Sequence, residues 1–381
     1  MKKDNKDRKI YLIRHGEPEV PAFGRFFYSA TDYPLSHDGR IEAGQTAEWL
    51  GEQCLSCATV VSSPLKRSRQ TAEYIADRIG TSVITDERFR EISCGEWEGL
   101  TFDEVMERYP DEFASRGKAL ASYKIPGGES FFEAGARFGE ALAEICNRYD
   151  GDIIIVAHAG VIRGYLLGCD VIDDLDDLFS IPMPYAGITI LNNGKPEKVG
   201  FKPLHFLNET QIQRIYRKWE VPDHIIRHMK GVADYQDKLL DRLEEKGIRY
   251  DRDALRKAAL LHDIRRLYPD HAEEAGTFVR EWGYPEVASL IANHHSACSY
   301  EIVEENETSS CGNGERLLHA EDILFYADKR VREDRVVSVA ERFEASRGNC
   351  TTPEAVEKHA LLYNRSVEIE KRIEEILKGE I

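Results

Sequence analysis

Short apolar runs alternate with amphipathic stretches up to about residue 205, and this alternation constrains the fold more than any other feature of the chain. The runs are KIYLIRHG, ATVVSSP, DIIIVAHAG and GITILNNG, and three of them are almost continuously apolar, as expected of strands buried on both faces of a sheet. The stretches between them have helical periodicity and end at glycines. The pattern predicts an α/β domain in three layers, with a mostly parallel sheet in the middle.

Beyond about residue 205 the expected strands stop and amphipathic helices follow one another. They run from HIIRHMKGVADYQDKLLDRLEEKG to PEAVEKHALLYNRSVEIEKRIEEILKG, which predicts an all-α helical bundle. A length of 381 residues also fits two domains, each large enough for its own core. We therefore expect domains at 1–207 and 215–381, with the polar segment 304–315 as an exposed loop in the second.

The composition narrows the class of partner. A net charge of −17 argues against binding to nucleic acid polymers or anionic membranes, which attract concentrated Lys and Arg. No apolar run reaches transmembrane length, and the charged start MKKDNKDRK is followed only by IYLI, so no signal peptide is expected. These features predict a cytoplasmic protein whose eight cysteines are thiols and whose ligands are small molecules.

Two strand ends carry candidate catalytic residues. LIRHG places Arg14 and His15 at the carboxyl end of one strand, and IIIVAHAG places His158 at the end of another. Because ligands of open α/β sheets bind outside the carboxyl ends of the strands, the two histidines are predicted to converge.

Phosphoryl transfer accounts for this combination of residues. A neutral imidazole accepts a phosphoryl group, and a phosphohistidine splits one difficult displacement into two easier ones. The transferred group needs cations, which Arg14 and Arg67 (in SSPLKRSRQTA, at a helix start) supply, and a proton donor for the leaving oxygen. Glu91, in EISCGEWEG, is the candidate acid and base.

RHG, SSPLKRSRQTA, EISCGEWEG, PGGES and VAHAGVIR occur in that order over roughly residues 9 to 200, and together they resemble the histidine phosphatase superfamily, also called the phosphoglycerate mutase-like fold. The resemblance implies that His15 is the nucleophile, that Arg14, Arg67 and His158 hold the phosphoryl group, and that Glu91 is the acid and base, with no cofactor required. The openings RHGEPE and DYPLSHDGRIEAG look more like small-molecule phosphatases such as α-ribazole phosphatase. A mutase remains an alternative.

The helical half carries a second set of candidates that could hold a metal. Imidazole nitrogen and carboxylate oxygen together suit divalent Mn, Fe, Mg, Co or Zn, and a helical bundle can collect such ligands from facing helices. The candidates are His228, His262, Asp263, His271, His294 with His295 beside it, and Asp328.

The order H…HD…D on successive helices resembles the HD superfamily of metal-dependent phosphohydrolases. The resemblance implies a first ion held by His228, His262, Asp263 and Asp328, and a second ion added by His271 and His294, with Asp263 bridging. Asp322 is the rival for the last ligand of the first ion. Where family members often have a lysine shortly after HD, this chain has Arg265 and Arg266, which concerns substrate contacts rather than the metal ligands.

These features together predict a bifunctional phosphohydrolase. Its first half would be a phosphomonoesterase for a small phosphorylated metabolite. Its second half would be a metal-dependent phosphohydrolase, with one or two ions, for a nucleotide or related phosphoester. The alternative is a single phosphatase or mutase in which the HD domain is a metal- or nucleotide-binding regulatory sensor. The oligomeric state is left open.

Overall fold

The computed structural model of the chain describes residues 8–21, 25–53, 55, 58–169, 171, 175–268, 270–294, 318–348 and 350–379. The chain forms two compact units, Met1–Pro203 with Glu281–Gly283, and Leu204–Arg280 with Tyr284–Ile381. His295 and the loop expected at 304–315 lie outside the described residues. Within those residues, no helix is long and apolar enough to cross a membrane.

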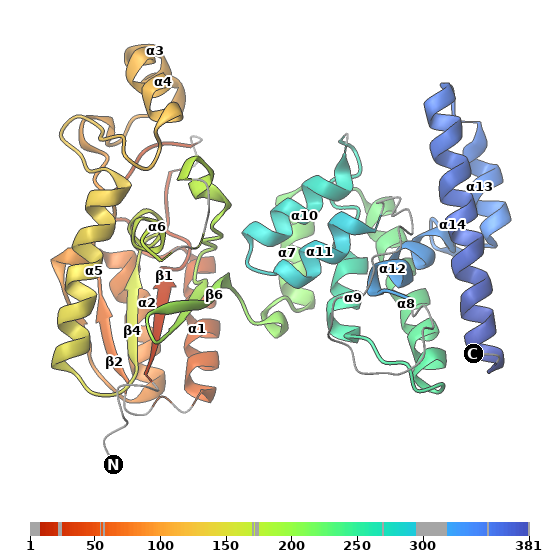
Figure 1. Cartoon of the computed structure of the whole chain (residues 1–381), viewed down its shortest axis with the longest axis horizontal. Helices are drawn as coiled ribbons and strands as arrows, with labels where there is room; N and C mark the ends of the chain where they lie inside the picture. The colour runs from red at the N-terminus through yellow and green to blue at the C-terminus, as the bar shows by residue number, and fades with distance from the viewer. Residues whose placement is uncertain are drawn as a thin grey trace. The chain divides into compact units, whose positions relative to one another are not determined.

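A six-stranded sheet forms the centre of the first unit, in the order β3-β2-β4-β1-β5-β6 (Figure 1). The first four strands in this order are parallel to one another, and β5 and β6 add an antiparallel edge. The prediction of a mostly parallel sheet is confirmed. The strands are β1 (Lys9–Arg14), β2 (Thr59–Ser62), β3 (Val83–Thr85), β4 (Ile153–Ala157), β5 (Ile188–Asn192) and β6 (Lys195–Phe201).

Helices cover both faces of this sheet, which gives the predicted three layers. One face packs against α5 (Phe131–Arg148) and α6 (Ala159–Leu167), and the other against α1 (His37–Glu52) and α2 (Lys66–Ile79). Alternate residues of β4 supply the two cores: Ile153 and Ile155 face the first layer, and Ile154 and Val156 the second. A strand buried on both faces needs this continuous apolar run.

A small aromatic core lies outside the sheet, and the loop that follows β1 packs into it. Phe27 and Trp97 pack there with α3 (Phe102–Arg108) and α4 (Pro110–Lys118) nearby in the chain. The Glu98 carboxylate accepts hydrogen bonds from the backbone N–H groups and the hydroxyls of both Ser29 and Thr31. These bonds fix the loop and, with it, the residues on either side of Ser29.

The second unit is helical, as predicted. Its helices are α7 (Glu209–Lys218), α8 (Asp223–Glu244), α9 (Arg252–Leu261), α10 (His271–Glu281), α11 (Pro285–Asn293), α12 (Ala320–Lys329), α13 (Val339–Arg347) and α14 (Pro353–Lys378).

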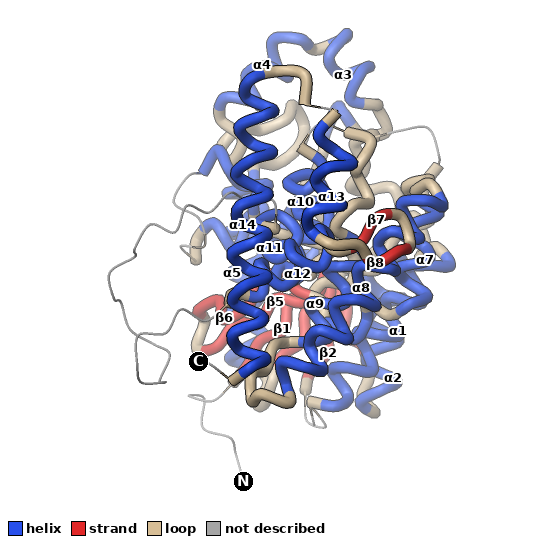
Figure 2. The backbone as a smooth tube through the Cα atoms, turned by 90° about the vertical axis from the view of Figure 1, so that its right-hand side faces the viewer, coloured by secondary structure: helices blue, strands red, loops and turns tan. Residues whose placement is uncertain are grey.

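The expectation that strands end near residue 205 needs one correction. A hairpin of β7 (Val331–Arg332) and β8 (Arg335–Val336) follows α12 and is the red pair beside α8 in Figure 2. Strands of two residues carry no detectable periodicity, so the sequence pattern did not reveal the hairpin.

Candidate active site and candidate metal centre

β1 and β4 are neighbours in the sheet, and their register brings the two histidines of the first unit together. Arg14 is paired with Ala157, so His15 and His158 are the next residues on each strand. The His15 backbone N–H donates to the Ala157 carbonyl at 3.0 Å, and the two imidazole rings lie 5.0 Å apart at 62°. The sequence predicted convergence at the carboxyl ends of parallel strands, and the structure places the two residues there.

His15 is a neutral imidazole with one nitrogen available for attack. Its Nδ1 lies 2.7 Å from the carbonyl oxygen of Gly16, which can only accept, so Nδ1 carries the proton and Nε2 keeps a lone pair. Burial, followed by the nearby charges of Arg67 and Arg14, holds the His15 pKa well below its usual value. His15 therefore has the protonation state that a nucleophile requires at neutral pH.

Arg67, in the first turn of α2, holds His158 in place. Its Nε donates to Nδ1 of His158 at 3.3 Å, while its terminal nitrogens donate to the carbonyls of Thr31 and Ser29. Because Nδ1 of His158 accepts, the proton of the neutral ring is on Nε2, which donates to the Ser63 hydroxyl at 2.8 Å. Burial and Arg67 hold the His158 pKa well below its usual value.

Arg14 presents a buried donor next to the histidines. Its guanidinium carbon lies 3.8 Å from the centre of the Tyr185 ring, and Nη1 donates to the Met183 carbonyl. Nε is buried and has no hydrogen-bond partner among the described residues. An unpaired buried donor is costly, so this N–H is suited to an anion that binds beside His15.

The Glu91 carboxylate lies at the N-terminus of α6, directly after His158. Oε1 accepts from the backbone N–H of Val161 at 2.9 Å and Oε2 from that of Gly160 at 3.1 Å. A Cβ on Gly160 would lie 2.7 Å from Oε1, so only glycine permits this approach. These helix amides thus hold the Glu91 carboxyl group at the N-terminus of α6, close to His158 in the chain.

The structure adds Arg163, the last residue of VAHAGVIR, for which the sequence predicted no role. It lies on α6, one turn beyond the N-terminus, and its Nε donates to the Ile181 carbonyl at 3.0 Å. Burial, followed by repulsion from Arg14, lowers its pKa to about 10. Side chains in helices point back toward the N-terminus, so its position on a helix that starts after His158 was the signal available.

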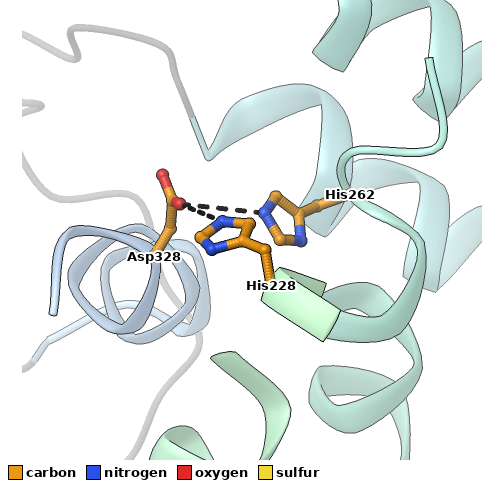
Figure 3. A group of neighbouring side chains, drawn as sticks. All are labelled: His228, His262 and Asp328. Atoms are coloured by element: carbon orange, nitrogen blue, oxygen red, sulfur yellow. Dashed lines mark hydrogen bonds and ion pairs between the residues drawn. The ribbon is translucent and has the colours of Figure 1, made fainter. Parts of the chain in front are cut away.

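In the second unit, three predicted ligands on three segments come together. His228 is on α8, His262 ends α9 and Asp328 is on α12. Their ligand atoms lie within 4.8 Å of one another, and all three residues are buried. Figure 3 shows both imidazoles turned toward one oxygen of Asp328, at 3.0 Å from His228 Nε2 and 3.9 Å from His262 Nε2.

Asp263 joins this cluster with both of its oxygens. Oδ2 lies 3.6 Å from His228 Nε2 and 3.5 Å from His262 Nε2, while Oδ1 lies 3.4 Å from Nε2 of His271. One oxygen thus faces the first predicted ion position and the other faces a ligand of the second. This is the orientation expected of a bridging carboxylate. His294 is also close, with its ring 5.2 Å from that of His262.

The imidazoles have the hydrogen-bonding pattern of metal ligands. Nδ1 of His262 donates to the Ala259 carbonyl at 2.8 Å, and Nδ1 of His294 to the Ile291 carbonyl at 2.5 Å. A ligating histidine usually donates its second N–H in this way. Nε2 of His262 is buried without a hydrogen-bond partner among the described residues and faces carboxylate oxygens, an arrangement that a cation between them would satisfy. The donor set therefore fits a divalent metal.

Cations of the chain itself also contact this cluster. Arg266 contacts Oδ2 of Asp263, and Lys329 Nζ lies 2.5 Å from Oδ2 of Asp328. Asp322, the rival ligand, instead pairs with Arg365 at 2.9 Å. Asp322 is therefore engaged away from the imidazoles.

Family comparisons match both halves of the chain. Residues 10–199 match the model of the histidine phosphatase superfamily (branch 1), and residues 225–346 match that of the HD domain. HD domains are typically metal-dependent, in agreement with the cluster of His228, His262 and Asp328.

Individual relatives match about half of the chain. Phosphoserine phosphatase 1 of Hydrogenobacter thermophilus is 34% identical over 167 residues, which cover 43% of this chain and 78% of that protein. Human 6-phosphofructo-2-kinase/fructose-2,6-bisphosphatase 1 is 33% identical over 156 residues, which cover 41% and 31%. Among solved structures, mycobacterial glucosyl-3-phosphoglycerate phosphatase is 27% identical, with 48% and 89% covered and a TM-score of 0.43. Bacillus stearothermophilus YhfR is 30% identical, with 50% and 94% covered and a TM-score of 0.45.

Proposed function

Because the chain belongs to the histidine phosphatase superfamily and carries an HD domain, it is a phosphoric ester hydrolase, and we propose that it is bifunctional. The first site would hydrolyse a small phosphomonoester through a phosphohistidine. The second would be a metal-dependent phosphohydrolase acting on a nucleotide or related phosphoester.

In the first site, Nε2 of His15 would attack phosphorus while the bond to the ester oxygen breaks. Glu91 would give a proton to the departing oxygen and later take one from the water that attacks the phosphohistidine, which releases inorganic phosphate and restores Nε2. Arg14, Arg67 and His158 would hold the phosphoryl group. Both ring nitrogens of His158 are bonded here, to Arg67 and Ser63, so His158 would have to exchange one of these bonds for a phosphoryl oxygen. The observation that carries this proposal is the hydrogen bond of His15 Nδ1 to the Gly16 carbonyl, which leaves Nε2 for attack, on an imidazole whose pKa burial and the charges of Arg67 and Arg14 hold low.

The substrate of this site would be a small phosphorylated metabolite. The names of the matched proteins, phosphoserine phosphatase and glucosyl-3-phosphoglycerate phosphatase, support a small monoester as the substrate class. The short RHGEPE opening favours a phosphatase of the α-ribazole phosphatase kind over a mutase.

In the second site, His228, His262, Asp263 and Asp328 would hold one ion, and His271 and His294 a second one bridged by Asp263. A bound divalent ion supplies Lewis-acid chemistry, stabilising charge on a phosphoryl oxygen and making water more acidic. The chain's own contribution is to orient the imidazoles and to fix the tautomer that leaves Nε2 for a cation. The carbonyls of Ala259 and Ile291 do this by accepting hydrogen bonds from Nδ1 of His262 and His294.

A screen of phosphorylated metabolites, with divalent metal or with EDTA, tests both halves. The proteins are the wild type, His15→Ala, Asp263→Ala and the control His37→Ala, which removes an exposed histidine at the start of α1. His15→Ala should lose only the EDTA-resistant activity and Asp263→Ala only the metal-dependent one. EDTA-resistant phosphomonoesterase activity that survives in His15→Ala would refute the first assignment.

The contacts of Arg266 with Asp263 and of Lys329 with Asp328 favour one alternative for the helical half, a regulatory sensor. Arg266 and Lys329 already balance part of the carboxylate charge of the cluster. Such internal pairing suits a site that binds a ligand without turning it over. Metal-supported binding of a nucleotide without turnover in the same screen would support this alternative, and metal-dependent turnover that Asp263→Ala abolishes would exclude it.

A further inference from the structure

Each arginine of the phosphoryl site faces an aromatic ring. The guanidinium carbon of Arg14 lies 3.8 Å from the centre of the Tyr185 ring, and that of Arg67 lies 5.4 Å from the centre of the Tyr28 ring. A ring against the face of a guanidinium attracts its charge and does not occupy the N–H groups, which lie in the guanidinium plane. Of these, the Nε–H of Arg14 has no partner among the described residues. The rings therefore restrict the two cations without competing for their donors.

Tyr185 is held on a turn attached to the nucleophile. The next residue, Ala186, has φ +53°, a left-handed conformation that costs energy for a residue with a side chain. Its N–H donates to the His15 carbonyl at 3.1 Å, and its own carbonyl accepts from the Thr46 hydroxyl at 2.9 Å. The Tyr185 ring consequently lies 5.8 Å from that of His15. The surrounding hydrogen bonds hold the strained turn at Ala186, and the turn fixes the position of the Tyr185 ring.

Tyr28 approaches from the opposite segment, the loop after β1. Its position is set by the five hydrogen bonds that Glu98 accepts from Thr31 and from Ser29, the residue adjacent to Tyr28. Burial, followed by interaction with Tyr185, raises the Tyr28 pKa. Two rings from segments more than 150 positions apart in the sequence thus lie against the two arginines.

We propose that Tyr28 and Tyr185 are positioning residues, and that their rings set the placement of Arg67 and Arg14 around the phosphoryl group. The pair acts through the guanidinium groups and transfers no proton. This inference rests on the proposed function of the first site, since it assigns the arginines to the phosphoryl oxygens.

Binding of inorganic phosphate to the full-length, EDTA-treated protein tests the inference without requiring turnover. Tyr185→Leu removes the ring, and the dissociation constant for phosphate should rise about tenfold. Tyr185→Phe keeps the ring and should restore binding to within about threefold of the wild type. Tyr74→Leu, at an exposed tyrosine on α2, is the control and should bind like the wild type.

Two substitutions at Tyr28 make the same comparison for Arg67. Tyr28→Leu removes the ring and should weaken phosphate binding, whereas Tyr28→Phe keeps the ring and should bind phosphate within about threefold of the wild type. Phosphate binding by Tyr28→Leu that equals the wild type would overturn the positioning role of Tyr28. Phosphate binding by Tyr185→Leu that equals the wild type would overturn the positioning role, even in a protein with full phosphatase activity. A tenfold loss of phosphate affinity in Tyr185→Leu would support the positioning role even if the protein turned over no substrate. The positioning role and the proposed phosphatase activity can therefore be refuted separately.

Discussion

Nε of Arg67 donates a hydrogen bond to Nδ1 of His158 over 3.3 Å. The proton between these two nitrogens belongs to Arg67, so Nδ1 of His158 must be unprotonated. A protonated His158 would place two N–H groups against each other. Burial, followed by the charge of the Arg67 guanidinium, lowers the pKa of His15. Arg67 thus adds to the effect of burial in disfavouring protonation of both imidazoles of the site.

Replacing Arg67 by Gln should raise the pKa of His15 and His158, because a neighbouring positive charge no longer opposes their protonation. The acid limb of the profile of kcat/KM against pH should move to higher pH, and kcat/KM at neutral pH should fall by about 10²–10³-fold. Arg69→Gln, at an exposed arginine of the same helix that pairs with Glu73, should change neither. An acid limb in Arg67→Gln that coincides with the wild type would contradict the electrostatic role.

The first unit should lose stability in mild acid. The pKa values of His15 and His158 are lowered on folding, so below about pH 6.5, the usual histidine value, the unfolded chain binds protons that the folded chain does not. Stability then falls as pH decreases. Urea unfolding at pH 7.5 and 5.5 should show a smaller loss in the His15→Gln, His158→Gln double variant than in the wild type. An equal loss in both proteins would exclude these histidines as the source.

Asp328→Asn and Asp322→Asn form a matched pair on α12. Asp328 faces His228 and His262, so its loss should weaken divalent-metal binding by more than about a hundredfold, as measured by competition with a chromogenic chelator. Asp322 pairs with Arg365, and both side chains are at most 9% exposed. Its variant should retain metal and lose about 3–5 kcal/mol of unfolding free energy. Normal metal affinity in Asp328→Asn would refute the centre.

Arg266→Ala should tighten metal binding, by about tenfold, because the guanidinium and a metal compete for Oδ2 of Asp263. Equilibrium titration with the metal alone measures this, with Arg280→Ala, at an exposed arginine of α10, as the control. Weaker binding in Arg266→Ala would mean that the guanidinium supports the ligand geometry rather than competing with it.

The sequence predicts those contacts that follow from local patterns, such as apolar runs and the direction of parallel strands. His15 and His158 end strands that the apolar runs identify, and parallel strands bring their carboxyl ends to one edge. The candidate metal ligands were predicted only as residue types on helices, since 3.6-residue periodicity says which face a residue occupies and not which helix it meets. Asp322 and Asp328 were therefore rivals until the structure paired Asp322 with Arg365.

The sequence by itself determined the two-part architecture, the parallel sheet, the helical second half and the two families, because periodicity and ordered motifs are properties of neighbouring residues. Only the tertiary structure decided that the Tyr185 ring lies against Arg14 and the Tyr28 ring against Arg67. It also decided that Asp263 turns one oxygen to His228 and the other to His271. These contacts join segments far apart in the chain, and their geometry depends on loops and helix packing, for which local sequence carries no repeating signal.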